Sequence, residues 1–211
     1  MPETTHIRLP EAARTVIFDQ DGVLIDSWDS SIHYFNRIRQ EMGLGPMSRD
    51  QEDYSFIHTV DQSIDHITPD HLKHLIPQAK ATVRFEELLP LVKLQPGIVE
   101  FLERLRDAGF KLAVDTNGGI EQHMILEHVG LLHLFHKIVT TADVAEGKPS
   151  PEGVHAILGE FDLNTAQALF IGDSSIDMRT ANNAGVTFWA YRNSDLKAGI
   201  HLADYGSVLL P

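Results

Sequence analysis

Five short apolar runs limit the folds open to this chain more than any other feature of its sequence. The runs are Thr15–Phe18, Lys111–Val114, Ile138–Thr140, Ala168–Ile171 and Val186–Ala190. They are rich in β-branched residues and are continuous rather than alternating, which is typical of strands buried on both faces of a sheet. Helix-like segments separate the later runs, and their ends carry proline and glycine signals. These signals are Pro96 and Gly97, Gly109, Ser150 to Glu152 with Pro151 as the first helical residue, and Gly185. Alternating strands and helices predict an α/β fold with a doubly wound parallel sheet.

The first run does not follow this rhythm, because about 90 residues separate Phe18 from the next strand near Lys111. Within this gap Ile32, Phe35, Ile38 and Met42 recur at helical spacing before Gly43. Such spacing indicates amphipathic helices rather than strands. We therefore predict a small helical domain at residues 28–89, inserted into an α/β core formed by residues 1–27 and 90–211.

Composition narrows the class of protein. The chain has 17 Lys and Arg against 30 Asp and Glu, a net charge of −13, which argues against a nucleic-acid partner. It contains no cysteine, so disulfides, thiolate zinc sites and cysteine nucleophiles are excluded. The N-terminal segment lacks the apolar run of a signal peptide, and no apolar stretch is long enough to span a membrane. We expect a soluble, cytoplasmic protein without a membrane partner.

Two acidic clusters follow two of the apolar runs. Asp19 and Asp21 follow the first run, and Asp173 and Asp177 follow the run at Ala168–Ile171. Taken alone, the clusters are also compatible with a solvated Asp-Gly turn and a helix cap. Together they place four carboxylates at the carboxyl edge of one sheet, where open α/β sheets bind ligands. Because such acids repel one another, a hard divalent cation with oxygen ligands is expected there, and Mg²⁺ fits best.

Two further junctions offer groups that bind anions. Thr116 begins a turn, Thr116-Asn117-Gly118-Gly119, that provides a hydroxyl and successive backbone N–H groups. Lys148 lies between a glycine and a proline shortly before a predicted helix. Each feature alone is also compatible with an ordinary capped turn or an exposed lysine. Beside a metal, however, they supply what binding of phosphate oxygens requires.

These four junctions, in this order, resemble the four motifs of the haloacid-dehalogenase-like (HAD) superfamily of phosphohydrolases. The resemblance implies a Rossmann-like core and a helical cap inserted after the first motif. It also implies that Asp19 is the nucleophile that forms an aspartyl-phosphate, that Asp21 is the general acid and base, and that Lys148 neutralises charge. Thr116, with Asn117, would bind the phosphate. Asp19, the backbone carbonyl of Gln20 and Asp173 would ligate Mg²⁺, and the full candidate metal set is Asp19, Gln20, Asp21, Asp173 and Asp177.

The strings FDQDGVLIDS, KPSPEG and IGDSSIDMRTANNAG are most similar to the phosphoglycolate phosphatase and β-phosphoglucomutase branch. The chain departs from the usual pattern at three positions. Gln20 stands where an apolar residue is usual, Val23 stands where most phosphatases have threonine, and Asp115 adds a carboxylate before Thr116.

The resemblance implies a Mg²⁺-dependent phosphatase that acts on a small phosphorylated metabolite. A phosphosugar mutase of the same fold is the alternative, and a non-catalytic phosphate-binding module is a third possibility that would leave Asp21 without a purpose. Substrate choice would lie in the inserted helices. There Arg49 is the first candidate contact for a second anionic group of the substrate, and the others are His58, Gln62 and Lys80.

Overall fold

The structure, a computed structural model, describes residues 6–210. Within this range, only the backbone of Ile57 is described. Residues 1–5 and 211, which the sequence placed in the α/β core, lie outside the described residues. The chain divides into two compact units, one formed by Met1–Ile25 with Leu94–Pro211 and the other by Asp26–Lys93. The predicted insertion at residues 28–89 falls within the second unit.

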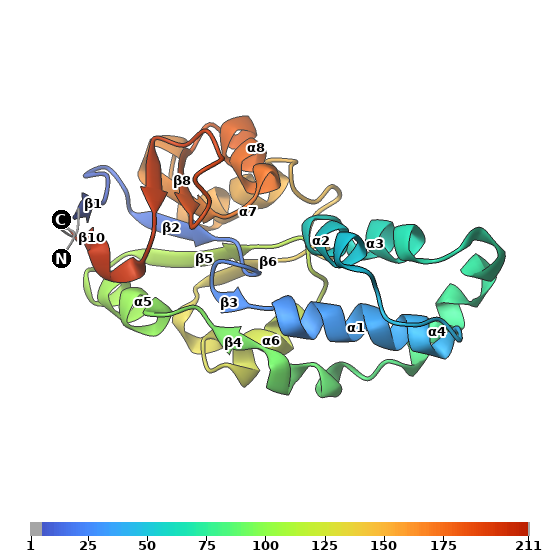
Figure 1. Ribbon diagram of the computed structural model, residues 1–211. Coiled ribbons are helices and arrows are strands. Elements are labelled where there is room, and N and C mark those ends of the chain that lie inside the picture. The colour runs from blue at the N-terminus through green and yellow to red at the C-terminus, as the bar shows by residue number, and fades with distance from the viewer. Residues whose placement is uncertain (1–5, 211) are drawn as a thin grey trace. The chain divides into compact units, whose positions relative to one another are not determined.

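The first unit is built on a six-stranded parallel sheet in the order β6-β5-β2-β7-β8-β9 (Figure 1). Its strands are β2 Thr15–Phe18, β5 Lys111–Asp115, β6 Lys137–Val139, β7 Ala168–Gly172, β8 Thr187–Tyr191 and β9 Ile200–Leu202. Each of the five apolar runs forms a strand of this sheet, and only β9 was not expected. The predicted doubly wound α/β fold is confirmed.

The order of the strands explains why the predicted ligand edge lies where it does. From β2 the chain proceeds outward through β5 to β6, and it then returns to place β7 on the other side of β2. Phe18, the last residue of β2, is in register with Val114 of β5 and Ile171 of β7. The loops after these three strands therefore emerge side by side at the switch point, the usual ligand position in such sheets.

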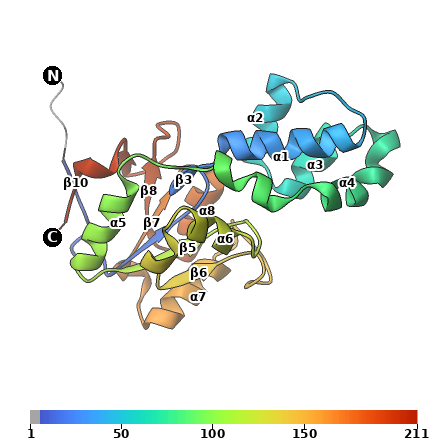
Figure 2. The same cartoon turned by 90° about the horizontal axis from the view of Figure 1, so that it is seen from below.

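Helices cover both faces of the sheet, with α7 and α8 on one face and α5 and α6 on the other (Figures 1 and 2). Their bounds are α5 Ile98–Asp107, α6 Gln122–His128, α7 Glu152–Phe161 and α8 Ser175–Ala184. Ile17 of β2 belongs to the apolar core beneath α7 and α8. Phe18 packs edge-on against Phe101 of α5, on the opposite face. Helix α7 begins one residue later than predicted, because Pro151 is its N-cap rather than its first helical residue.

Short elements complete the chain. β1 Ile7–Arg8 pairs with β10 Val208–Leu209, and β3 Ile25–Asp26 pairs with β4 Lys93–Leu94. Short 3₁₀ helices occupy Asp70–Leu75, Phe85–Glu87, Leu89–Leu91, Leu132–Leu134, Thr165–Gln167 and Tyr205–Ser207.

The second unit is helical, as the apolar spacing predicted. Its helices are α1 Trp28–Glu41, α2 Arg49–Ile57, α3 Val60–Ile67 and α4 Ile76–Thr82. Phe35 and Ile38 of α1 pack with Ile64 of α3 in a small apolar core of its own. Helix α1 ends at Glu41 with Met42 as its C-cap, and Gly43 follows with a positive φ of 73° that suits glycine. Across residues 6–210, no helix combines the length and the apolar character needed to cross a bilayer.

Candidate active site

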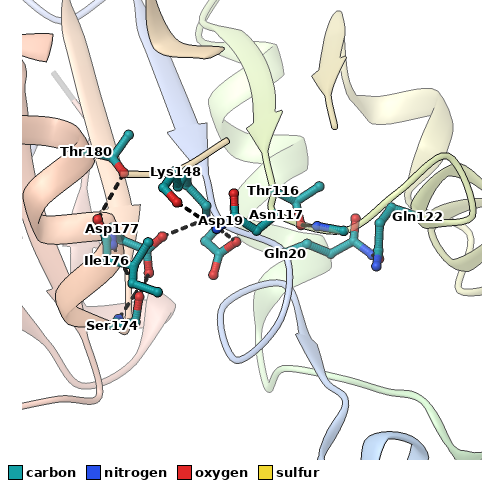
Figure 3. Close-up of polar contacts among 11 residues, drawn as sticks. Asp19, Gln20, Thr116, Asn117, Gln122, Lys148, Ser174, Ile176, Asp177 and Thr180 are labelled. Carbon is teal, nitrogen blue, oxygen red and sulfur yellow. Dashed lines mark hydrogen bonds and ion pairs between the residues drawn. The ribbon is translucent and has the colours of Figure 1, made fainter. Parts of the chain in front are cut away.

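Two carboxylates and one lysine form a buried ion-pair cluster at the carboxyl edge of the sheet (Figure 3). The Nζ of Lys148 lies 2.7 Å from Oδ1 of Asp19 and 2.6 Å from Oδ1 of Asp177. Asp19 directly follows β2, Asp177 lies in the first turn of α8, and Lys148 lies in the loop before α7. The lysine side chain is 4% exposed and that of Asp177 is 0% exposed, so water screens these charges little.

A third carboxylate, that of Asp173, joins this cluster. One carboxylate oxygen each from Asp19, Asp173 and Asp177 lies within 4.8 Å of the other two. Burial, reinforced by the charge of Asp177, raises the pKa of Asp19 well above its ordinary value and that of Asp173 to about 7. Acids held this close stay ionised more easily with a bound cation. The oxygen-only donor set is one that could hold a hard divalent metal ion.

The cation of Lys148 is strongly stabilised. Burial alone would lower the pKa of its ammonium group, but the carboxylates of Asp177, Asp19 and Asp115 outweigh burial and raise it. The balance of these effects favours the charged form of Lys148. One permanent positive charge faces several negative ones, which leaves the site with an excess of negative charge for a metal ion to offset.

Two glycines allow the acids to approach the strands so closely. Gly22, with a positive φ of 81°, leaves room for the Asp173 carboxylate, whose Oδ2 would lie 2.0 Å from a β-carbon at that position. A β-carbon at Gly172 would lie 2.3 Å from the β-carbon of Asp177. Any side chain at either position would push an acid of the cluster out of place.

The start of α8 fixes the orientation of Asp177. Ser174 caps the helix, and its hydroxyl and backbone N–H both donate to Oδ2 of Asp177. The hydroxyl in turn accepts a hydrogen bond from the backbone N–H of Asp177, which completes a capping box. With Oδ2 held in this way, Oδ1 points to Lys148. The sequence alone suggested Asp173 or Ser175 as the capping residue. The cap is Ser174 instead, and it also orients a charged group.

The Thr116 turn lies on the other side of Asp19 (Figure 3). Its backbone is anchored by a hydrogen bond from the N–H of Thr116 to the carbonyl of Val139 in β6. Asn117 donates from Nδ2 to the backbone carbonyl of Lys148 over 2.9 Å. Asn117 therefore connects the turn to the lysine loop, so the structure gives this predicted phosphate contact a linking role as well.

The backbone donors of this turn are used differently from the prediction. The N–H of Gly118 donates to Oγ1 of Thr116, and the N–H of Gly119 donates to Oε1 of Glu121. The sequence placed both N–H groups on a bound anion. They are instead occupied within the turn, because nearby side-chain oxygens satisfy them locally. The hydroxyl of Thr116 keeps its own proton available for donation.

Asp115, the unusual acid before Thr116, is buried beside the same cluster. It is 3% exposed, and its Oδ2 has no hydrogen-bond partner. Its carboxylate packs against Gly153 in the first turn of α7, where a β-carbon would lie 2.4 Å from Oδ1. Burial raises its pKa to about 6, although the charge of Lys148 opposes the shift.

Two predicted site residues of the α/β unit remain, Asp21 and Gln20. Asp21 is half-buried, its backbone bridges to Ile25, and its charge acts on Asp173. The side chain of Gln20 is fully buried and donates from Nε2 to Oε1 of Gln122 in α6. Gln122 was not predicted as a site residue, because a lone glutamine at a helix start carries no signal of its burial.

The four candidate substrate contacts of the helical unit interact with other residues of that unit. Arg49, the first residue of α2, is 69% exposed, pairs with Glu52 and Asp53, and lies over the ring of Trp28. Lys80 pairs with Asp61. His58 stacks on Tyr54, and Gln62 closes the capping box of α3.

Comparison with known proteins agrees with this geometry. Residues 16–191 match the family model described as haloacid dehalogenase-like hydrolase. The chain is 32% identical over 208 residues to a phosphoglycolate phosphatase of Rhodobacter capsulatus, covering 92% of each chain. It is 29% identical over 172 residues to the pyrophosphatase PpaX of Bacillus pumilus, covering 81% of this chain and 79% of that protein.

Among solved structures, a HAD-superfamily hydrolase of subfamily IA from Geobacter sulfurreducens superposes with a TM-score of 0.80. It is 29% identical, and the alignment covers 92% of this chain and 93% of that one. The family match extends from β2 to the end of β8 and so includes the whole ion-pair cluster. The chain belongs to the family of haloacid dehalogenase-like hydrolases and is related to its phosphoglycolate phosphatases.

Proposed function

We propose that this hydrolase is a Mg²⁺-dependent phosphatase that cleaves a small phosphate monoester through an aspartyl-phosphate on Asp19. One observation carries the proposal: Asp19, Asp173 and Asp177 gather within 4.8 Å of one another at the switch point of the sheet. Lys148 alone cannot balance these charges. A site of this kind suits a dianionic phosphoryl group only when a divalent cation is also bound.

Asp19 is the proposed nucleophile. A carboxylate oxygen attacks phosphorus in line, the bond from phosphorus to the ester oxygen breaks, and the leaving oxygen takes a proton from Asp21. Asp21 then accepts a proton from the water that cleaves the aspartyl-phosphate, which releases inorganic phosphate and restores both acids. Asp21 is half-buried and lies two residues after Asp19, so it can serve the same site from the same strand end.

Lys148 and Thr116 are the proposed stabilising groups. Lys148 holds Oδ1 of Asp19 over 2.7 Å and so orients the nucleophile. The hydroxyl of Thr116 donates to a phosphoryl oxygen. Asp19, the carbonyl of Gln20 and Asp173 would hold Mg²⁺, with Asp21 and Asp177 completing the acidic surroundings. When bound, the ion keeps the buried acids ionised and stabilises the charge that develops on the phosphoryl oxygens.

A small phosphorylated metabolite is the proposed substrate, and phosphoglycolate is the first one to test because several relatives are named for it. Phosphoglycolate carries a carboxylate in addition to its phosphate. Arg49 is the proposed contact for such a second anionic group, because a guanidinium binds a carboxylate in a bidentate manner.

The test combines metal removal with a variant of the nucleophile. Phosphate release from a panel of monoesters should require Mg²⁺ and should stop with excess chelator. Asp19→Asn keeps the shape of the side chain but removes its nucleophilicity, so turnover should fall by at least about 10³-fold. Trifluoroberyllate, a mimic of a phosphoryl group on a carboxylate, should bind the wild type with Mg²⁺ but should not bind Asp19→Asn.

The outcomes separate the alternatives. Turnover near the wild-type rate in purified Asp19→Asn would exclude an aspartyl-phosphate on this residue. Activity that depends on a sugar bisphosphate and yields an isomerised sugar phosphate, rather than inorganic phosphate, would identify a mutase instead.

A further inference from the structure

A buried pair of amides connects the loop of the nucleophile to α6. The Nε2 of Gln20 donates a hydrogen bond to Oε1 of Gln122 (Figure 3). Gln20 is 0% exposed and Gln122 is 9% exposed. A buried amide loses its hydrogen bonds to water, so burial without a partner costs free energy. The hydrogen bond between the two amides offsets part of this cost and is therefore a specific contact.

Strand alternation explains why Gln20 reaches α6. Ile17 faces the core beneath α7 and α8, whereas Phe18 faces α5 on the other side of the sheet. Side chains two apart share a face. Asp19 therefore turns with Ile17 toward Lys148, and Gln20 turns with Phe18 toward the face that carries α6. The side chain of Gln20 thus extends away from the ion-pair cluster, although its backbone belongs to the site.

Gln122 is wedged against the Thr116 turn. A β-carbon at Gly118 would lie 2.1 Å from Nε2 of Gln122, so the side chain of Gln122 packs directly against the backbone of Gly118. Gly118 is also the centre of the turn's hydrogen bonds. Its N–H donates to Oγ1 of Thr116, and its carbonyl accepts from both the backbone and the hydroxyl of Thr141. A displacement of Gln122 would move Gly118 and, with it, the hydroxyl of Thr116.

The pair is a poor solution for stability alone. Oε1 of Gln20 is buried without a hydrogen-bond partner, whereas two apolar side chains in place of the pair would leave no polar group unpaired. A buried polar contact that is not fully satisfied needs another explanation than packing. The contact that it does make joins the residue next to the nucleophile to the turn that carries Thr116.

We propose that Gln20 and Gln122 are positioning residues that form an amide clamp, which fixes the Thr116 turn relative to Asp19 and thereby sets the affinity for the phosphoryl group. The inference rests on the proposed function, because it assumes that the hydroxyl of Thr116 binds that group. The clamp acts on phosphate binding more than on the chemical step, because its hydrogen bond and its contact with Gly118 lead to the turn that carries the hydroxyl of Thr116.

The experiment compares Gln20→Leu, Gln122→Leu and the double variant, with Mg²⁺ present throughout. For each protein it measures kcat and KM for a phosphate monoester, inhibition by inorganic phosphate, and the melting temperature. In both single variants the KM and the inhibition constant of phosphate should rise about tenfold, while kcat should change less than about threefold, because a small displacement of a binding group weakens binding. Both single variants should also melt at lower temperature, since each leaves one amide unpaired.

The double variant separates positioning from stability. With both amides replaced by leucine, no amide is left unpaired, so the melting temperature should return toward that of the wild type. The inhibition constant of phosphate should remain about tenfold raised, because the hydrogen bond that holds the turn is still missing. Ile157→Val in α7, a buried position away from the turn, is the matched control that lowers stability without changing phosphate affinity.

The outcomes are distinct. An active wild type, together with single variants whose phosphate inhibition is unchanged, would overturn the clamp and leave the proposed function intact. A double variant that regains wild-type phosphate affinity along with its stability would show that the pair only fills space. A wild type that neither cleaves monoesters nor binds phosphate would overturn the proposed function and the clamp with it.

Discussion

Both compact units contain a cation that pairs with two carboxylates, but the pairs are buried in the α/β unit and exposed in the helical unit. In the α/β unit, the Lys148 side chain is 4% exposed and pairs with Asp19 and Asp177. In the helical unit, Arg49 is 69% exposed and pairs with Glu52 over 3.5 Å and with Asp53 over 3.1 Å. These exposed pairs are somewhat longer than the buried ones, which measure 2.7 and 2.6 Å.

Their surroundings make them different. A buried pair holds its charges in place, and removal of one partner leaves an uncompensated charge in a medium of low dielectric constant. An exposed pair exchanges readily with water and contributes little to stability. Chemistry that needs groups at fixed positions therefore belongs to the edge of the sheet, whereas the helical unit can exchange partners at small cost. The following variants test this contrast.

Lys148→Met should have the largest effect. It keeps most of the length of the side chain but leaves the buried carboxylates of Asp19 and Asp177 without a cation. Without metal, the free energy of unfolding should fall by about 3–5 kcal/mol. Turnover should fall by at least about 10²-fold, because the nucleophile loses its orientation and the phosphoryl group loses a positive charge. Denaturant unfolding and phosphate release measure the two effects.

Lys80→Met is the matched control in the helical unit, where Lys80 pairs with the exposed Asp61. It should lower the free energy of unfolding by less than about 1 kcal/mol. Equal losses in the two lysine variants would contradict the contrast between the units. Mg²⁺ should restore part of the stability lost in Lys148→Met, because it offsets the same carboxylates, and should have no such effect on Lys80→Met.

Asp21→Asn should separate binding from catalysis at the edge of the sheet. The variant keeps the shape of the side chain but cannot transfer a proton, so kcat should fall by about 10²- to 10⁴-fold. Binding of inorganic phosphate should change only a few fold, because the proposed phosphate contacts are Thr116 and Lys148. Steady-state kinetics and phosphate titration measure both. Parallel loss of binding and turnover would contradict a role confined to proton transfer.

Asp115→Asn should change stability in a pH-dependent way. Burial raises the pKa of Asp115 from 3.8 to about 6, so the folded protein holds this proton more tightly than the unfolded chain does. Between these pH values the wild type therefore loses stability as pH rises, and above pH 6 the full cost of about 3 kcal/mol is present. The variant lacks that cost. At pH 7.5 it should be more stable than the wild type by up to this amount.

At about pH 3, below both pKa values, the aspartate is largely protonated in both states, so the two proteins should differ little. Denaturant unfolding across this range gives the difference curve directly. A difference that does not vary with pH would mean that the buried carboxylate is not the group responsible.

The α/β core could be predicted because each strand is marked by a local apolar run, and because parallel strands place their carboxyl ends at one edge of the sheet. Each of the five apolar runs forms a strand, and parallel strands bring their carboxyl ends to one edge. Asp19, Asp173 and Lys148 come together for this reason, although up to 154 residues separate them along the chain. No knowledge of the side-chain packing was required.

Other features depend on packing and could not be predicted. Helix α2 lies within the predicted helical domain but was not singled out as a separate helix, because RDQEDYSFI has no clear apolar stripe and only the capping residues Ser48 and Gln51 mark its start. Gln122 resembles a surface residue until Gln20 is placed opposite it. The N–H groups of Gly118 and Gly119 were predicted to bind an anion, because a sequence does not show that the side chains of Thr116 and Glu121 accept their hydrogen bonds.

Arg49→Ala should have the smallest effect and tests the exposed side of the contrast. The free energy of unfolding should change by less than about 1 kcal/mol, because the pairs with Glu52 and Asp53 are exposed. The effect on catalysis should depend on the charge of the substrate. Phosphoglycolate and 2-hydroxyethyl phosphate have similar size, but only phosphoglycolate has a carboxylate. For phosphoglycolate, kcat/KM should fall by up to about fivefold, the limit that an exposed ion pair sets.

For 2-hydroxyethyl phosphate, kcat/KM should remain unchanged in Arg49→Ala. Asp53→Asn sharpens this measurement, because it removes one acid that competes with the substrate for the guanidinium of Arg49. That variant should raise the preference for phosphoglycolate over 2-hydroxyethyl phosphate, in the direction opposite to Arg49→Ala. If both variants leave the ratio of the two kcat/KM values unchanged, Arg49 is not the contact for a second anionic group. If Arg49→Ala lowers the two values equally, the residue acts on the helical unit as a whole rather than on the charge of the substrate.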